Sequence, residues 1–518
     1  MKRCFAFILS LSALVLCACS AGKTDIPQPT EIPAATSAPT AAPSQSGSGI
    51  ETIALFKDIH YYEYSEDDRL FCRVEYPVLQ MSSVSHNQAL GSSVDAFNAA
   101  LAAQASETYT RLLNSARADV ELNVENPGGY YSRTDLYVTR ADSLALSALC
   151  VNESGAASRL SQRGYSSINL DSRTGRQLAL RDVSTDAERL TALIGEQLEK
   201  DYPKAKFYDL EAAMGQYAQD ISALVWTLDY QGLSFYFAPY ELAPYEEGSF
   251  CVGLRFDDHP ELFSIYYTRQ PFSYAVPVVE GRCLNYDMDS DGVSDFISLS
   301  RQEKKGVNYL VIGVNSSELS VNVSMTGYEA YVVYAGPSRS YLYINAHNSS
   351  DYGYISVYRL ERTGAALLGM LYDTSLQAAG YTPECPGIPL LTKPEQLILG
   401  TKVELLGTLT GVKDYSIGSA GMPETADEYY RVYADTTLTA KGDFATAAID
   451  PVTGRGLNTA VKIAAGTRMY YYHSDGAGYV DLMSEDGQCC RMYVSGRGQA
   501  QTVNGMPVDQ CFDGLIYK

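Results

Sequence analysis

Residues 226–248 read WTLDYQGLSFYFAPYELAPYEEG, and they set the architecture of the region around them. Gly232 predicts a tight hairpin turn between two short strands. The residues that follow the turn alternate in side, so Phe235 and Phe237 are expected to face one layer of the structure. Tyr236 is expected to face the other layer.

The hairpin is followed by an aromatic corner. Pro239 and Pro244 stiffen the backbone beside Tyr240 and Tyr245. Such tyrosines either pack into the core or serve as recognition anchors, since they lose little side-chain entropy on binding. We therefore take Tyr240 and Tyr245 as candidate ligand-binding residues, with packing as the alternative.

Helical and strand periodicities alternate outward from this stretch, which is typical of the α+β class. We predict two α+β domains, at 51–168 and 169–270, with helices laid on antiparallel sheets. The expected helices are 87–113, 187–201 and 210–221, and the expected strands lie in 62–85, 130–139, 143–151 and 224–237.

The same region resembles a known family. Residues 169–182, with NLD and then TGRQLALRD, together with 226–248 closely resemble the extracellular region of the lysozyme-sensing anti-sigma-V factor family. The resemblance covers residues 55–268. The same pair of domains of unknown function precedes the catalytic domain of a peptidoglycan deacetylase. The resemblance implies lysozyme or peptidoglycan as candidate partners.

The chain departs from the family at two points. Relatives often carry Gly-Gly-Ala-His before the Asn-x-Asp strand, whereas residues 154–158 here read SGAAS. The N-terminus is also expected to be a cleaved leader rather than a cytoplasmic sigma-binding segment. The resemblance therefore does not imply an anti-sigma mechanism for this chain.

The N-terminus has the layout of a bacterial lipoprotein. A basic start and an apolar run predict a signal peptide at 1–18. The run ends in LCAC at 16–19, which resembles the lipobox and implies that Cys19 is acylated, for example with palmitate. An ordinary signal peptide is the alternative. Residues 19–50 then read as a lipid anchor and a Pro/Thr/Ser-rich linker. We expect a protein anchored through lipid at the extracellular face of the cell membrane.

Composition excludes several classes of protein. Lys and Arg number 39 and Asp and Glu 61, so the formal net charge is −22 and nucleic acid is not expected as a partner. A hydrophobic content of 46% excludes wholesale disorder. Eight cysteines follow Cys19 without any CxxC pair, so they are either disulfides or buried thiols rather than a zinc site.

The sharpest chemical motif is DMDSDGVSD at 287–295. Oxygen ligands at alternate positions of a tight loop can converge on one cation, and the glycine permits the turn. The expected ligands are the side chains of Asp287, Asp289, Asp291 and Asp295 and the carbonyl of Val293. Ser298 stands where an EF-hand needs glutamate, so the loop resembles strand-loop-strand calcium sites and predicts structural calcium. An acidic surface turn without metal is the alternative.

Two all-β domains are expected after residue 270. Regularly spaced short strands predict a β domain at 275–378 that carries the calcium loop. Residues 390–518 predict a small barrel similar to bacterial SH3 modules, which often bind cell-wall peptides.

No familiar catalytic motif occurs: GxSxG, HExxH and the phosphate-binding loop are missing from the sequence. We therefore expect no catalytic residues and a non-catalytic binding or sensing role at the bacterial envelope. The alternative is an enzyme that modifies cell-wall glycan through an unrecognised site, or a protein accessory to one.

Overall fold

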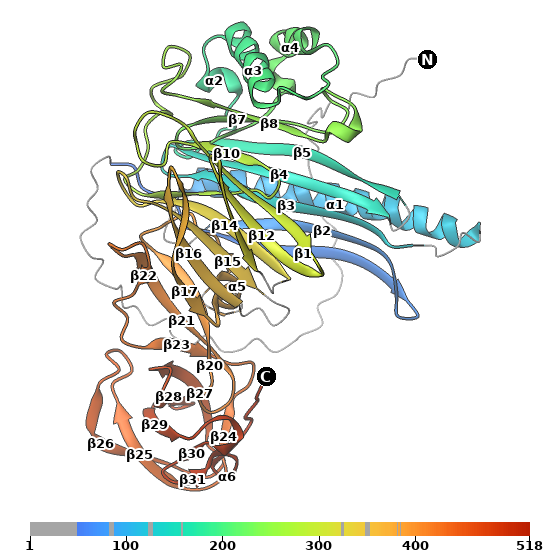
Figure 1. The fold of residues 1–518 in the computed structure, drawn as a ribbon. Coiled ribbons are helices and arrows are strands. Elements are labelled where there is room, and N and C mark those ends of the chain that lie inside the picture. Colours follow the sequence, from blue (N-terminus) through green and yellow to red (C-terminus); the bar gives the residue numbers. More distant parts are fainter. Residues whose placement is uncertain are drawn as a thin grey trace. The chain divides into compact units, whose positions relative to one another are not determined.

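The computed structural model describes residues 49–81, 87–122, 128–156, 159–322, 326–347, 353–380, 382–383 and 385–518 (Figure 1). Cys19, the predicted signal peptide and nearly all of the predicted linker lie outside these residues. None of the helices in the described ranges combines the length and apolar character needed to cross a membrane.

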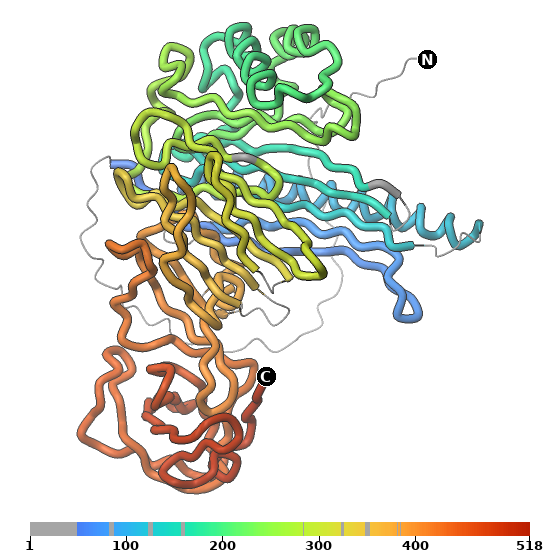
Figure 2. Tube along the Cα trace, in the orientation of Figure 1, coloured from blue at the N-terminus to red at the C-terminus, as the bar shows by residue number. Residues whose placement is uncertain are grey.

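The first layer is a six-stranded sheet in the order β19-β1-β2-β3-β4-β5. Helix α1 (Gln88–Glu121) runs along this sheet (Figure 2) and continues past the predicted end at residue 113. Asn87 caps α1, because its Oδ1 accepts a hydrogen bond from Ala89 N at 3.0 Å. Buried α1 residues such as Leu90 and Leu101 share one core with the strands. The strands are β1 (Leu55–Glu66), β2 (Arg69–Met81), β3 (Tyr130–Ala141), β4 (Ala145–Ala156), β5 (Arg159–Asp171) and β19 (Ile388–Pro389).

The second region places helices on a three-stranded antiparallel sheet, β6-β7-β8, as the alternating periodicities predicted. Phe235 and Phe237 join the core beneath the helices. Tyr236 instead packs with Leu149 and Val151 of β4, so the alternation is confirmed. The elements are α2 (Leu180–Val183), α3 (Ala187–Asp201), α4 (Leu210–Gln219), β6 (Val225–Leu228), β7 (Gly232–Phe237) and β8 (Phe250–Arg255).

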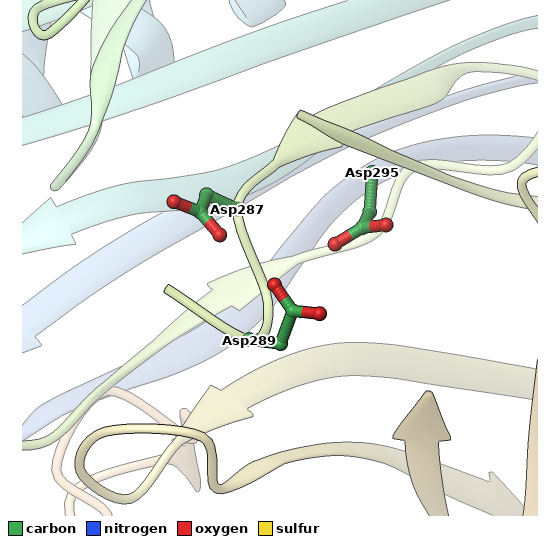
Figure 3. A group of neighbouring side chains, drawn as sticks. All are labelled: Asp287, Asp289 and Asp295. Atoms are coloured by element: carbon green, nitrogen blue, oxygen red, sulfur yellow. The ribbon is translucent and has the colours of Figure 1, made fainter. Parts of the chain in front are cut away.

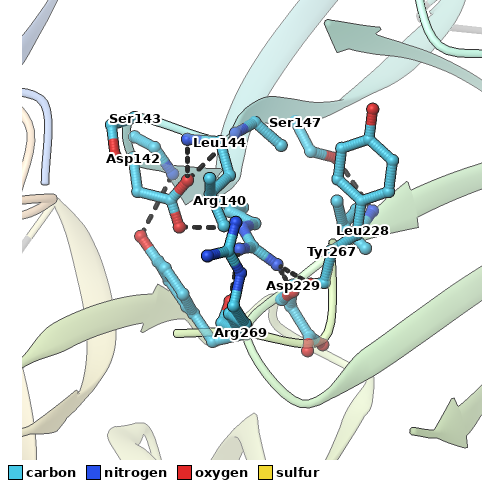
Figure 4. A network of polar contacts seen from close by, with 12 residues as sticks. Arg140, Asp142, Ser143, Leu144, Ser147, Leu228, Asp229, Tyr267 and Arg269 are labelled. Atoms are coloured by element: carbon cyan, nitrogen blue, oxygen red, sulfur yellow. Dashed lines mark hydrogen bonds and ion pairs between the residues drawn. The ribbon is translucent and has the colours of Figure 1, made fainter. Parts of the chain in front are cut away.

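A buried arginine joins these two regions (Figure 4). Arg140 is fully buried and donates through Nε to Asp142 Oδ2 at 2.9 Å. Its terminal nitrogens donate to the backbone oxygens of Asp229, Tyr267 and Arg269 at 2.7–3.1 Å. A buried guanidinium is tolerated only when its donors are satisfied. The network therefore fixes the end of β3 against the β6–β7 turn and the segment after β8.

Residues 274–372 form two antiparallel sheets, in the orders β10-β11-β12-β13 and β17-β16-β15-β14-β9, which share a core. The strands are β9 (Tyr274–Pro277), β10 (Cys283–Tyr286), β11 (Asp295–Lys304), β12 (Val307–Val314), β13 (Ser317–Asn322), β14 (Gly327–Tyr334), β15 (Ser340–His347), β16 (Gly353–Glu361) and β17 (Gly364–Tyr372).

The C-terminal strands belong to one hydrogen-bonded sheet that curls into a half-barrel around its own core (Figure 1). The strands are β18 (Thr374–Ser375), β20 (Leu397–Val403), β21 (Leu409–Ile417), β22 (Pro423–Glu424), β23 (Tyr430–Tyr433), β24 (Leu438–Ala440), β25 (Phe444–Ile449), β26 (Gly456–Ile463), β27 (Arg468–Ser474), β28 (Tyr479–Ser484), β29 (Cys489–Ser495), β30 (Thr502–Val503), β31 (Met506–Pro507) and β32 (Phe512–Asp513). Two short helices accompany them, α5 (Leu376–Gly380) and α6 (Val508–Cys511). A mixed α/β region followed by all-β sheets agrees with the predicted order of classes. The first sheet is not wholly antiparallel as predicted, because β2 and β3 pair in parallel across the connection through α1.

The cysteines of the described ranges are mostly buried thiols. The free thiols of Cys72, Cys150, Cys489, Cys490 and Cys511 are buried, and that of Cys251 is partly buried. Burial raises the pKa of Cys490 to about 12, which leaves its thiol protonated and unreactive at neutral pH.

Candidate calcium site and aromatic corner

The aspartate loop between β10 and β11 brings three carboxylates together (Figure 3). One oxygen from each of Asp287, Asp289 and Asp295 lies within 4.8 Å of the others. Asp287 and Asp295 are buried, and Asp289 is the most exposed of the three. Carboxylate oxygens at this spacing suit a hard cation such as calcium.

Hydrogen bonds to its own backbone shape the loop. Asp287 Oδ1 accepts from Asp291 N at 3.1 Å, and Asp287 Oδ2 accepts from Gly292 N at 2.9 Å. Asp291 Oδ1 accepts from Val293 N at 2.7 Å. Gly292 has a φ of 87°, a left-handed conformation that glycine adopts without strain. The predicted turn at this glycine is therefore present.

Two predicted ligands lie differently from the other three. The carboxylate of Asp291 forms an ion pair with Arg362 and is not part of the converging group. The side chain of Val293 is exposed, but the atom expected to bind the ion is its backbone carbonyl oxygen. The assignment of Asp291 and Val293 as ligands stays a prediction.

Polar groups from other elements border the loop. Arg255, only 6% exposed, lies with Nη2 3.4 Å from Asp287 Oδ2. Its Nη1 donates to Gly292 O at 3.3 Å, and Asn315 Nδ2 donates to Asp295 Oδ1 at 2.8 Å. These donors partly offset the repulsion among the carboxylates. The three carboxylates fit calcium, and the guanidinium of Arg255 lies beside one of them, Asp287.

Gln231, in the β6–β7 turn, ties the loop to the preceding region. Its Oε1 accepts from Asp287 N at 2.8 Å and its Nε2 donates to Asp287 O at 3.1 Å. Sequence reasoning missed Gln231 and Arg255, because neither shares a local motif with the loop. The only sequence signal for either residue is that Gln231 lies in the hairpin stretch at 226–248.

The aromatic corner is partly exposed and is held by hydrogen bonds. The rings of Tyr240 and Tyr245 lie 5.2 Å apart between centroids. Tyr240 is 65% exposed and has a φ of 70°, which is rare for a bulky residue. The Tyr245 hydroxyl donates to Ser161 O of β5 at 2.8 Å. The backbone beside Tyr240 is braced as well, because Glu241 Oε2 accepts from Ala238 N at 2.6 Å.

The corner and the helices before it thus define an α+β module, with a helical layer on one sheet face and an aromatic loop at its edge. Residues 180–257 of this module match the family model described as a protein of unknown function, DUF3298. The matched residues include Tyr240 and Tyr245.

Two solved structures of DUF3298 family members are similar to part of the chain. One, from Bacteroides fragilis NCTC 9343, is 18% identical and covers 41% of this chain and 95% of its own, with a TM-score of 0.32. The other, from Pseudomonas aeruginosa PAO1, is 12% identical and covers 42% of this chain and 98% of its own, with a TM-score of 0.29. No curated protein matches the chain.

Proposed function

We propose that this chain is a lipid-anchored binding or sensing protein of the bacterial cell envelope, without catalytic activity. Its candidate ligands are lysozyme and peptidoglycan. The lipobox-like LCAC at 16–19 supports the location, and the resemblance of residues 55–268 to the anti-sigma-V ectodomain supports the ligand. The DUF3298 match at 180–257 overlaps the most specific half of that resemblance.

The observation that carries the proposal is the exposed Tyr240, which lies against Tyr245 on a backbone with positive φ. Its ring packs on Tyr245, and Tyr245 is in turn bonded to β5. An exposed aromatic side chain that is already ordered gives contact area at little entropic cost. A bulky residue with positive φ also indicates a conformation that the surroundings impose, and such positions cluster at functional sites.

Calcium has a bracing role in this proposal. Asp287, Asp289 and Asp295 would hold the ion, with Asp291 and the Val293 carbonyl as further predicted ligands. The loop is bonded to Gln231 of the DUF3298 module, so an ion there would stiffen the support of that module. The C-terminal half-barrel, as an SH3-like module, would add a contact to the cell wall.

The test is a calorimetric titration of residues 43–518, which form one compact unit, with lysozyme and separately with soluble peptidoglycan fragments. Saturable binding of either ligand, with the glycan recovered unchanged, is the expected result. Hydrolysis or deacetylation of the fragments would support the enzyme alternative instead. Failure of both ligands to bind would contradict the proposal.

A further inference from the structure

A small cavity lies beside the aspartate loop, with a volume of about 250 Å³. It is bordered by the β14–β15 turn, the end of β16 and Asp289. Three arginines line it, although the whole chain carries a formal charge of −22. The lining residues are Asp289, Ser338, Arg339, Ser340, Tyr341, Arg359, Leu360, Glu361 and Arg362.

Two of the three arginines, Arg339 and Arg359, keep hydrogen-bonding capacity for a ligand, whereas Arg362 is already paired with Asp291. Arg339 Nη2 donates to Gly418 O at 2.9 Å, and within the described residues its buried Nε has no hydrogen-bond partner. Arg359 contacts Glu361 through Nε at 2.7 Å, which leaves its terminal nitrogens outside that pair. The side chains of this pair are 56% and 50% exposed. Such an exposed pair contributes little stability, so an incoming anion can compete with its carboxylate.

The cavity shares its wall with the candidate calcium site. Ser338 Oγ donates to Asp289 O at 3.0 Å, and Ser340 Oγ donates to Met288 O at 2.7 Å. The β14–β15 turn therefore holds the loop in place. Asp289 is the most exposed of the three converging aspartates and also lines the cavity. A cation held by the triad would add positive charge at the rim of the cavity.

We propose that this cavity binds the carboxylate or phosphate group of a sugar-sized ligand, with Arg339 and Arg359 as hydrogen-bond donors and with Arg362, which is paired with Asp291, adding positive charge to the wall. Guanidinium groups match both oxyanions in geometry and charge. The volume is below the usual range for drug-sized ligands, so the cavity fits one sugar-sized unit rather than a long chain segment. Calcium at the triad strengthens binding; this last part rests on the proposed function.

The experiment compares three ligands that share one sugar ring: glucose, glucuronate and glucose 6-phosphate. Each is titrated calorimetrically into residues 43–518, with calcium chloride and with EGTA. We expect binding of one or both anions but not of glucose, and tighter binding with calcium. Comparison of the two anions shows whether carboxylate or phosphate is the preferred group.

Arg359→Gln removes one donor at an exposed position, so the fold should tolerate it. We expect affinity for the preferred anion to fall about tenfold, as for loss of a charged hydrogen bond. The matched control is Arg301→Gln, because Arg301 is also exposed and paired, with Glu280, but does not line the cavity. This control should bind like the unmodified chain.

Two results would overturn the inference: equal affinity for glucose and the anions, or an Arg359→Gln variant that binds as tightly as the Arg301→Gln control. A separate titration with calcium chloride alone tests the metal site. Calcium binding without any anion binding would reject the cavity proposal and leave the metal proposal standing. Anion binding without calcium binding would leave the cavity proposal standing and would reject the contribution of calcium.

Discussion

The sequence predicts that Gly232 permits the tight hairpin turn, but in the structure this glycine has a different role. The turn itself is closed by Asp229, whose Oδ1 accepts from Gln231 N and Gly232 N at 2.7 Å each. A Cβ atom on Gly232 would lie only 2.3 Å from Leu254 O on the neighbouring strand β8. The glycine is therefore needed for close approach of two strands.

Gly232→Ala should consequently destabilise the chain. The added methyl group must displace the backbone of β8, and overpacking of this kind typically costs about 1–3 kcal/mol. Urea unfolding of the variant checks the value. Gly215→Ala is the matched control, because the space around that helical glycine is open. Equal unfolding midpoints for both variants would contradict the assigned role.

His473 predicts a dependence of stability on pH. Burial and the positive charges of Arg431 and Arg491 lower its pKa to about 4, from about 6.5 in an unfolded chain. Above pH 6.5 the imidazole is neutral in both states. Between pH 6.5 and 4 the unfolded chain takes up the proton first, so the folded state should lose at most about 3 kcal/mol as pH falls.

His473→Gln removes this titration. The variant should lose less stability than the unmodified chain when urea unfolding at pH 7.5 is compared with pH 5. The difference between the two pH slopes is the quantity to measure, because carboxylates elsewhere titrate equally in both proteins. Identical changes of stability with pH in the two proteins would show that the pKa of His473 is not lowered in the folded state.

Two arginine–aspartate pairs with the same spacing and opposite burial lie along β3 and at its C-terminal end. Arg140 and Asp142 are fully buried, whereas the Arg133 side chain is 60% exposed beside Asp135. Arg140→Met leaves Asp142 as an uncompensated buried charge, which should cost about 3–5 kcal/mol. Arg133→Met should cost about 0–1 kcal/mol. Thermal or urea unfolding of the two variants tests the contrast. Equal losses of stability would contradict the role given to the buried Arg140 network.

The periodicity of side chains along the sequence predicted many of the helices and strands, but it predicted little of how they pair and pack. The alternation of Phe235, Tyr236 and Phe237 and the bounds of α3 follow from side-chain periodicity, so both could be read from the sequence. The pairing of β1 with β19 joins residues more than three hundred positions apart, and no periodicity encodes such a contact. The same limit applies to the candidate calcium site. The aspartates share one sequence motif, whereas Gln231 and Arg255 contact Asp287 only through tertiary packing.

For the molecule as a whole, calcium should stabilise the fold. A ligand that binds only the folded state raises the free energy of unfolding by RT ln(1 + [L]/Kd), about 2.7 kcal/mol at a hundredfold excess over Kd. Thermal unfolding of residues 43–518 with calcium chloride and with EGTA measures the shift. Asp289→Asn removes one charge from the least buried member of the triad and should reduce the shift. No shift in the unmodified chain would reject the calcium site.

The most direct test of a ligand-binding role uses the exposed Tyr240. Residues 43–518 are titrated with lysozyme and with peptidoglycan fragments, in the unmodified form and as Tyr240→Ala. Tyr372→Ala is the control, because Tyr372 is similarly exposed, at 69%, but lies on β17 outside the DUF3298 module. We predict saturable binding that weakens at least about tenfold in Tyr240→Ala, as for loss of an aromatic anchor, and stays unchanged in Tyr372→Ala. Binding that is equal in both variants, or missing from the unmodified chain, would contradict the account.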